Sequence, residues 1–205
     1  MATEPSEGVI KFKFNLKMSS KIEESLYIDL EKWRVILYKM NLIGEYPIEK
    51  VGFGNLSRKV HPHENQFIIT GTQTGKFPNL SGSQYTKVTK CDLQKMSIDA
   101  VGPIAPSSES LTHYAIYETC PQVKAIFHVH HNELWNYMLA GEYKKTADNI
   151  NYGTHEMAQE AQKCIGKNLK GIFVMAGHQD GIIAYGSSTE EAGKIILETL
   201  KESKK

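Results

Sequence analysis

Two histidines lie two positions apart in the apolar segment Ala125–His130. The composition of this segment predicts a β-strand. Because side chains alternate between the faces of a strand, His128 and His130 project from one face, while Phe127 and Val129 point the other way into a core. The two imidazoles, about 7 Å apart at their Cβ atoms, can converge on one ion. The pattern indicates either a divalent-metal site, with zinc as the expected metal, or a hydrogen-bonded histidine pair.

A third ligand would distinguish a metal site from a hydrogen-bonded histidine pair, because zinc in proteins usually has at least three protein ligands. His178 is the strongest candidate, since it lies in a Gly-His-Gln-Asp-Gly turn between two predicted strands, where glycine lets the backbone bend. A site with three histidines leaves a coordination position open, which is typical of catalytic zinc. The remaining histidines fit exposed or structural roles better: His61, His63, His113, His131 and His155.

Glu109 follows Ser107 and Ser108 at the start of a predicted helix. The helix dipole stabilises a carboxylate in the first turn. Two roles fit this position: a helix cap, or a residue that moves between metal ligand and general base. Periodicity does not separate these roles, so both stay open from the residues alone.

The elements that must position these side chains follow from hydrophobic periodicity and capping signals. A capping box at Ser20 and Glu23 predicts where the first helix begins. We expect strands at 8–17, 51–60, 66–70, 85–89, 125–130, 172–175 and 182–185, and helices at 20–41 and 107–120, after Thr154 and after Ser188. Short loops between strand pairs indicate antiparallel pairing, so we predict one layered domain that mixes helices with a mostly antiparallel sheet. The strand at 8–17 would be added at its edge.

The composition limits the class of function. The chain has 205 residues, 40% of them hydrophobic, and a formal net charge of +1, so a nucleic-acid partner is not expected. The three cysteines are widely spaced and odd in number, which favours a reducing compartment and argues against a cysteine-based zinc site. No apolar run approaches the roughly 20 residues that span a bilayer, and no signal-peptide pattern occurs. We therefore expect a cytoplasmic protein that does not contact membranes.

With these motifs in their order, the sequence resembles the class II aldolase and adducin family, over residues from about 25 to 200. The segments that carry the resemblance are Gly54-Asn55-Leu56-Ser57, Ile69-Thr70-Gly71-Thr72, Pro106-Ser107-Ser108-Glu109 through His113, Ala125–His130, Gly153-Thr154 and Gly181 to Ala192. The resemblance implies a three-layer α/β/α domain around a largely antiparallel sheet, assembled as a homotetramer. We assign residues 21–205 to this domain and residues 1–20 to an N-terminal extension.

The resemblance also implies roles for individual residues. Members similar to fuculose-phosphate aldolase hold zinc with three histidines, here His128, His130 and His178, and use the glutamate of the Ser-Ser-Glu motif, here Glu109, as acid and base. Helix N-termini and glycine-rich turns offer free N–H groups to an anion. The implied substrate and phosphate contacts are Gly54, Asn55, Thr70, Gly71, Ser107 and Ser108.

The sequence also departs from the family pattern. The family usually has His-Gly at the third ligand, whereas this chain has His178-Gln179-Asp180-Gly181. The loop that follows Thr70 is longer than in the family. The tyrosine that protonates the cleaved aldehyde in sugar-phosphate aldolases has three candidates here: Tyr137, Tyr143 and Tyr152.

The function that these features predict is a zinc-dependent aldolase-type lyase. It would cleave or form a carbon–carbon bond of a small hydroxy-carbonyl, sugar-like substrate, phosphorylated or not. An epimerase or dehydratase on the same scaffold is the alternative, although family epimerases tend to have aspartate where Glu109 stands. A non-catalytic, adducin-like interaction module would lack the ligands that are present here. A zinc hydrolase has no further supporting motif such as HExxH.

Overall fold

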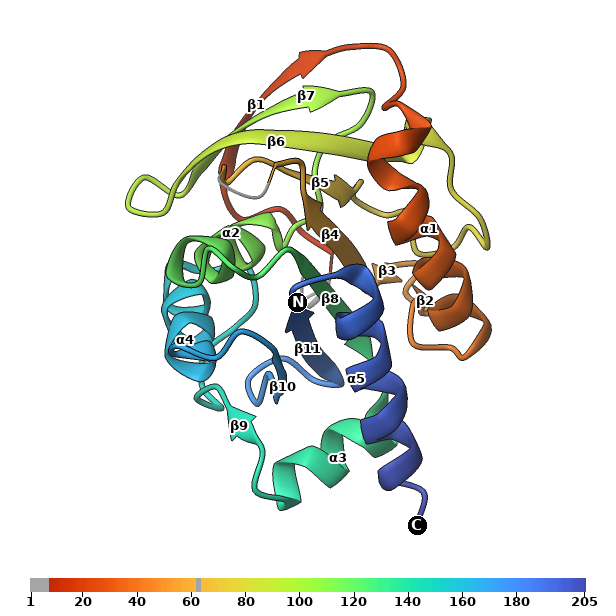
Figure 1. Cartoon of the computed structure of the whole chain (residues 1–205), viewed down its shortest axis with the longest axis vertical. Helices are drawn as coiled ribbons and strands as arrows, with labels where there is room; N and C mark the ends of the chain where they lie inside the picture. The colour runs from red at the N-terminus through yellow and green to blue at the C-terminus, as the bar shows by residue number, and fades with distance from the viewer. Residues whose placement is uncertain (1–7, 62–63) are drawn as a thin grey trace.

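In the computed structural model, which describes residues 8–61 and 64–205, the strand that carries the two histidines is β8 (Ala125–His130). It pairs in antiparallel orientation with β4 (Asn55–Lys59) and with β11 (Gly181–Gly186), as Figure 1 shows. Asn55 is therefore opposite His128, and Gly181 is opposite His130. This register brings β4 and the turn before β11 to the histidines. Residues 1–7 of the expected extension, and Pro62 and His63, lie outside the described residues.

Six other described strands complete a large sheet, and two form a separate pair. The six are β1 (Lys13–Met18), β5 (Phe67–Thr70), β6 (Tyr85–Asp92), β7 (Ser97–Gly102), β9 (Lys144–Lys145) and β10 (Gly171–Val174), and the pair is β2 (Gly44–Glu45) and β3 (Gly52–Phe53). In the described part of the chain, nine strands form one sheet in the order β1-β7-β6-β5-β4-β8-β11-β10-β9, and β2 pairs with β3. Only β1 with β7 and β9 with β10 are parallel among these described neighbours, so the prediction of a mostly antiparallel sheet is confirmed.

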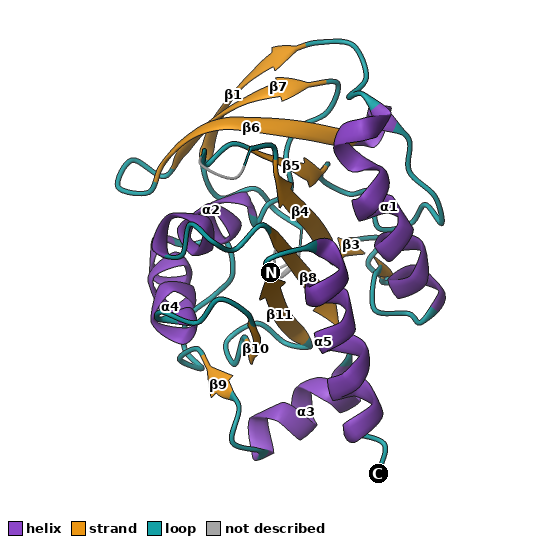
Figure 2. Ribbon diagram, viewed as in Figure 1, coloured by secondary structure: helices purple, strands orange, loops and turns teal. Residues whose placement is uncertain are grey.

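Helices cover the sheet around β8. The described residues contain α1 (Glu24–Lys39), α2 (Ser110–Thr119), α3 (Asn132–Ala140), α4 (His155–Ile165) and α5 (Thr189–Glu202). Figure 2 shows α1 and α5 on one side of β8 and α2 and α4 on the other. Phe127 and Val129 pack in the hydrophobic core with α1 and α5, whereas Ile126 packs in a second core with α2 and α4. His128 and His130 therefore face the side of α2 and α4.

The predicted strand at 8–17 is shorter and begins later, at Lys13. Strand β1 forms the edge of the sheet beside β7, as expected for an added edge strand. Phe12, immediately before it, is buried, while Phe14 is 42% exposed. The alternating apolar pattern thus overstates the buried face, because an edge strand has a covering core on only part of its length.

The first helix begins at Glu24 rather than near Ser20, so the predicted capping box is wrong. The N-cap residue is Glu23, and its side chain makes no capping hydrogen bond. The reason lies in the preceding backbone. The N–H of Ser19 donates to the carbonyl of Gly102 and that of Ile22 donates to Gly82, which holds this stretch extended against the loops.

The predicted strand at 51–60 is divided at Gly54, which separates β3 from β4. Gly54 has φ +78°, and a Cβ there would lie 2.8 Å from Cγ1 of Ile43. Glycine is therefore required both by the left-handed backbone and by the close packing. Because the strand is interrupted at Gly54, Asn55 lies in β4 of the main sheet and not in β3, which pairs with β2.

The caps predicted for the last two helices are confirmed: Thr154 accepts from the N–H of Met157, and Ser188 accepts from that of Glu191. Helix α3 and strand β7 were not predicted. Among the described residues, no helix is both long and apolar enough to cross a membrane.

Candidate metal centre

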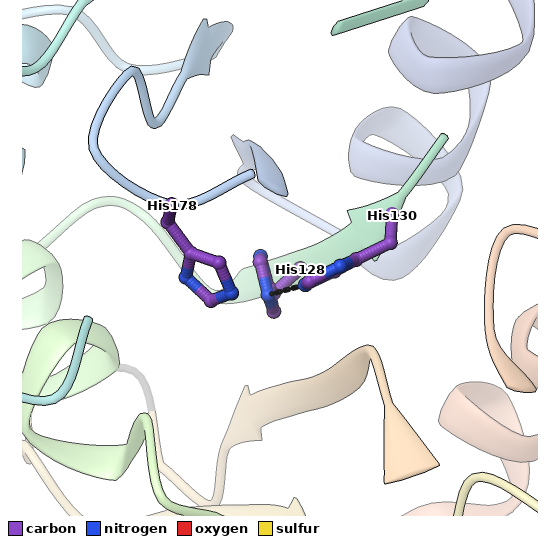
Figure 3. A group of neighbouring side chains, drawn as sticks. All are labelled: His128, His130 and His178. Carbon is purple, nitrogen blue, oxygen red and sulfur yellow. Dashed lines mark hydrogen bonds between the residues drawn. The ribbon is translucent and has the colours of Figure 1, made fainter. Parts of the chain in front are cut away.

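Three buried imidazoles meet beside the end of β8. His128, His130 and His178 are each at most 4% exposed, and one ligand atom from each lies within 4.8 Å of the others (Figure 3). The ring centroids are 4.7 Å apart for His128 and His130, 5.2 Å for His128 and His178, and 4.8 Å for His130 and His178. The three side chains can therefore hold one metal ion.

The hydrogen bonds of the outer ring nitrogens indicate which nitrogen faces the centre. Nδ1 of His128 lies 3.2 Å from the carbonyl oxygen of Ile182, which can only accept, so Nδ1 carries a proton. In the neutral ring, Nε2 then holds the lone pair. The Nδ1 of His130 lies 2.9 Å from the hydroxyl of Tyr46. Metal-ligating histidines are usually oriented in this way by a partner on the other nitrogen.

The distances at the inner nitrogens fit a cation. Nε2 of His128 lies 2.9 Å from Nε2 of His130 and 2.9 Å from Oε2 of Glu109. Lone pairs and a carboxylate oxygen so close together repel unless a proton or a metal ion lies between them. Burial holds the pKa of His130 well below its ordinary value, so this imidazole stays neutral and can coordinate. The donor set of three imidazoles fits zinc or another divalent transition metal.

His178 reaches the centre from the turn between β10 and β11. Its N–H donates to the carbonyl of Met175, and its own carbonyl accepts from the N–H of Gly181. Asp180 has φ +64°, so the residues inserted relative to the family's His-Gly pattern are accommodated in a left-handed turn. A Cβ on Gly181 would lie 3.2 Å from Cε1 of His128, so this glycine lets the turn approach β8 closely.

Glu109 lies at the N-cap position of α2, but its carboxylate does not cap the helix. It is 1% exposed and faces the histidines instead, with Oε1 3.4 Å from Nδ1 of His178. The amide of Asn55 donates to Oε2 at 3.4 Å. Burial alone would raise the pKa of Glu109, but the imidazoles of His128 and His178 hold it well below its usual range. Of the two roles considered from sequence, the geometry excludes that of a side-chain cap.

A polar pocket adjoins this centre. Five of the six residues expected to contact substrate or phosphate line it: Gly54, Asn55, Gly71, Ser107 and Ser108. Thr70 does not, because its hydroxyl accepts from the N–H of Leu56 and is buried between β5 and β4. Residues of the following turn line the pocket in its place: Thr72, Gln73, Thr74 and Gly75. Asn55 connects the pocket to the centre through its contact with Glu109.

The three candidate tyrosines differ in whether they contact the histidines. The ring of Tyr152 is 4.8 Å from that of His178 and is 3% exposed. Tyr137 and Tyr143 instead pack against each other with centroids 5.9 Å apart, and the hydroxyl of Tyr143 donates to Glu202. The structure thus brings Tyr152 alone among these three described tyrosines to the histidines.

Behind the centre lies a buried polar network that the sequence did not reveal. His113, fully buried, contacts Ser57 through Nδ1 at 2.7 Å, and Ser57 contacts the hydroxyl of Tyr117 at 2.8 Å. Burial lowers the pKa of His113 to about 3, so its ring is neutral. The four-residue spacing of His113 and Tyr117 on α2 was the available signal, because it places both side chains on one helix face.

The family model described as Class II Aldolase and Adducin N-terminal domain matches residues 35–203. The chain therefore belongs to the class II aldolase and adducin family. No curated protein matches it.

Solved structures share the fold. The L-fuculose-1-phosphate aldolase of Thermus thermophilus is 17% identical with a TM-score of 0.66, over 89% of this chain and 92% of that one. YgbL of Escherichia coli, described as a proposed aldolase/epimerase/decarboxylase, is 19% identical with a TM-score of 0.68, over 90% of this chain and 89% of that one. A sugar-phosphate aldolase of Thermotoga maritima is 16% identical with a TM-score of 0.67, over 88% and 93%.

Proposed function

We propose that this chain is a zinc-dependent, aldolase-type lyase that cleaves or forms a carbon–carbon bond of a small hydroxy-carbonyl compound with an anionic end. The observation that carries the proposal is a buried carboxylate in contact with two histidines of a buried group of three, next to a polar pocket. Family membership supports the same class of reaction.

The residues that would hold the metal are His128, His130 and His178. A divalent metal bound there supplies Lewis acidity toward a carbonyl oxygen. The protein's contribution is to keep three imidazoles and one carboxylate together in a buried site. Buried in this way, each charge acts more strongly than it would in solvent.

In this proposal, Glu109 moves the proton. A hydroxy-carbonyl compound becomes nucleophilic at carbon when a proton next to its carbonyl is removed, and retro-aldol cleavage returns that proton. A general base must be ionised and within reach of the proton that it takes. The low pKa of Glu109 provides the ionised form, and Asn55, which donates to it, holds the carboxylate in orientation.

The polar pocket would bind the anionic end of the substrate. Hydroxyls of Ser107 and Ser108 and the side chain of Asn55 line it together with the glycines of two turns. Backbone N–H groups of such turns and the N-terminal end of α2 attract an anion. This supports a phosphate or carboxylate on the substrate, placed so that its carbonyl reaches the histidines.

Epimerisation is the second candidate, because one structural neighbour is named with epimerase among its activities. It too needs proton or carbon transfer next to a carbonyl, so the same four side chains would serve. A non-catalytic, adducin-like role is disfavoured because a binding module needs no buried carboxylate facing three ligands.

The experiment that tests the proposal is hydrogen–deuterium exchange. Zinc-loaded protein in deuterated water should exchange a carbon-bound proton of dihydroxyacetone phosphate, detected by proton NMR without any aldehyde partner. Metal-free protein serves as the control. Zinc-loaded protein that binds the compound but exchanges no proton would contradict a lyase or epimerase of this kind.

We also propose the finer features of the family architecture. Two hydrophobic cores on opposite sides of β8 support a three-layer α/β/α arrangement. The homotetramer rests on family resemblance, and light scattering on the purified chain tests it. The assignment of residues 1–20 as an extension is supported by the family match, which begins at residue 35.

A further inference from the structure

A short irregular segment precedes β1 and lies outside the family match. Residues 8–11, here called the N-terminal arm, have no helix or strand structure. The arm is anchored at its downstream end, where Phe12 is 7% exposed in the core beside α2 and α4. From Lys13 to Met18 the chain then pairs in register with β7. The arm therefore extends from a fixed point toward the candidate site.

One end of the arm borders the polar pocket. Gly8 lines this pocket with Asn55 and Ser108. The side chain of Gln73 connects the arm to the pocket wall, because its Nε2 donates to the carbonyl of Gly8 at 3.2 Å and its Oε1 accepts from the N–H of Gly52 at 2.8 Å. A Cβ on Gly8 would lie 2.2 Å from Gln73 Nε2, so the contact is as close as the backbone allows.

The rest of the arm holds Tyr152. The N–H of Val9 donates to the Tyr152 hydroxyl at 3.0 Å, and Nζ of Lys11 donates to its backbone carbonyl at 3.1 Å. The same ammonium lies 3.9 Å from the centre of the Tyr152 ring, which is a cation–π distance. Because the Tyr152 ring contacts His178, the arm determines what stands next to the metal ligands.

We propose that the N-terminal arm forms a wall of the substrate site and selects short anionic hydroxy-carbonyl substrates. It does so by closing the pocket at Gly8 and by holding Tyr152 against His178. Lys11 and Gln73 are positioning residues in this scheme, since they act through Tyr152 and through the backbone of Gly8. The proposal rests on the proposed function for the identity of the ligand, but not for the contacts of the arm.

The chemistry of the wall indicates the substrate class. Tyr152 presents an aromatic face at the histidines, while the far end of the site is polar. A substrate must place its anion among backbone N–H groups and hydroxyls, and Asn55, which lines the pocket and donates to Glu109, connects this end of the site to the ligands. A longer sugar phosphate would have to displace the arm.

The test uses inorganic phosphate with the full zinc-loaded chain. Calorimetry should find that Lys11→Met and Tyr152→Phe weaken phosphate binding about fivefold, as expected for loss of one or two such contacts. Lys13→Met is the matched control, because Lys13 is exposed in β1 and lies outside the site. Unchanged affinity in both test variants would overturn the proposal.

Limited trypsin digestion gives a measurement that needs no variant. Cleavage after Lys11 requires the arm to leave the site, so saturating phosphate should slow it several-fold. Cleavage after Lys167, in the exposed loop that follows α4, is the internal control. A rate after Lys11 that phosphate does not change, in protein that calorimetry shows to be saturated, would also overturn the proposal.

Failure of this proposal is distinguishable from failure of the proposed function. Wild-type protein that takes up zinc and exchanges the proton of dihydroxyacetone phosphate, but shows no phosphate effect on the arm, would overturn the role of the arm alone. In that case the contacts between the arm and the site would be structural and independent of substrate.

Discussion

Oε2 of Glu109 lies 2.9 Å from Nε2 of His128, at the place where the first turn of α2 meets the end of β8. The contact joins a helix terminus to a central strand, and both side chains are at most 1% exposed. This buried contact places the carboxylate beside the ligand nitrogens before any substrate arrives, which is a condition for efficient proton transfer.

The first prediction concerns this carboxylate. Glu109→Gln should keep the metal but lower turnover by about 100-fold or more, because the amide has nearly the same shape and cannot accept a proton. Metal analysis and the deuterium exchange of dihydroxyacetone phosphate measure the two quantities separately. Turnover within a few-fold of wild type would show that the proton moves through another group.

A second prediction concerns the ligands. His130→Ala should lose most of its zinc, because two imidazoles remain where at least three are usual. Wild-type protein should be stabilised by zinc, by about 2.7 kcal/mol at a free concentration 100-fold above the dissociation constant. For a chain of this size, thermal unfolding should then shift by roughly 5–11 °C between zinc and chelator.

His61→Ala is the control for the ligand variant, since His61 is exposed in a turn. It should show the full zinc-dependent shift. If His130→Ala kept the same shift, the three-histidine site would be wrong.

The third prediction concerns a buried arginine that supports the pocket. The guanidinium of Arg34, 1% exposed, donates to the carbonyls of Thr74 at 3.1 Å and Phe77 at 2.6 Å. Glu31 on the same helix accepts from the N–H of Leu80 at 2.7 Å. Helix α1 therefore holds both parts of the loop whose first turn lines the pocket.

Arg34→Met should lower the free energy of unfolding by about 3 kcal/mol, because the loop carbonyls lose their buried donor. Arg34→Lys should restore part of it, since one ammonium cannot reach all the carbonyls that a guanidinium does. Urea denaturation measures the change, with exposed Lys39→Met as the control. Equal stability of Arg34→Met and the control would refute the role of the arginine.

A fourth prediction concerns pH. Burial lowers the pKa of His113 to about 3, whereas an unfolded histidine titrates near 6.5. The unfolded chain therefore binds a proton in this range that the folded chain does not. The stability that His113 contributes is complete above pH 6.5 and is lost as the pH falls toward 3, by about 1.4 kcal/mol per pH unit.

His113→Asn removes this titration and keeps a polar side chain beside Ser57. Stability curves of metal-free wild type and variant between pH 4 and 7 should differ in slope by about one proton. Parallel curves would mean that His113 is accessible to protons in the folded state.

The parts of the fold that the sequence predicted share a strong local signal. Strand β8 was placed at its observed bounds because Phe127 and Val129 alternate with the histidines and are both buried. The last two helices were placed because Thr154 and Ser188 make the expected capping bonds. In each case the local preference and the tertiary packing agree.

The parts of the fold that the sequence did not predict depend on tertiary contacts or have only a weak local signal. The start of α1 moved because Ser19 and Ile22 donate to distant loops, which no local pattern reveals. The buried face of strand β7 consists of Ile98, Ala100 and Gly102, which is a weak apolar alternation. Helix α3 is capped by His131, whose Nδ1 accepts from the N–H of Leu134, an uncommon cap.

The residues of the candidate site also divide into those that a local sequence pattern predicts and those that it does not. The pair on β8 followed from strand geometry, whereas His178 and Glu109 depended on family resemblance. Tyr152 could not be chosen over the other tyrosines, because its position depends on contacts with an arm that is far away in sequence. Thr70, the last residue of β5, lies outside the pocket lining because its hydroxyl accepts from the N–H of Leu56, and its contact with substrate stays a prediction.

The edge strand β1 has a consequence for the tendency of the protein to aggregate. Among the described residues no strand pairs with its outer side, which offers backbone N–H and C=O groups that another copy of the chain could extend into a continuous ribbon. Lys13 and Lys17 are exposed along this strand, so two such edges approaching each other would repel. High salt screens that repulsion, and aggregation of concentrated protein should therefore increase with ionic strength.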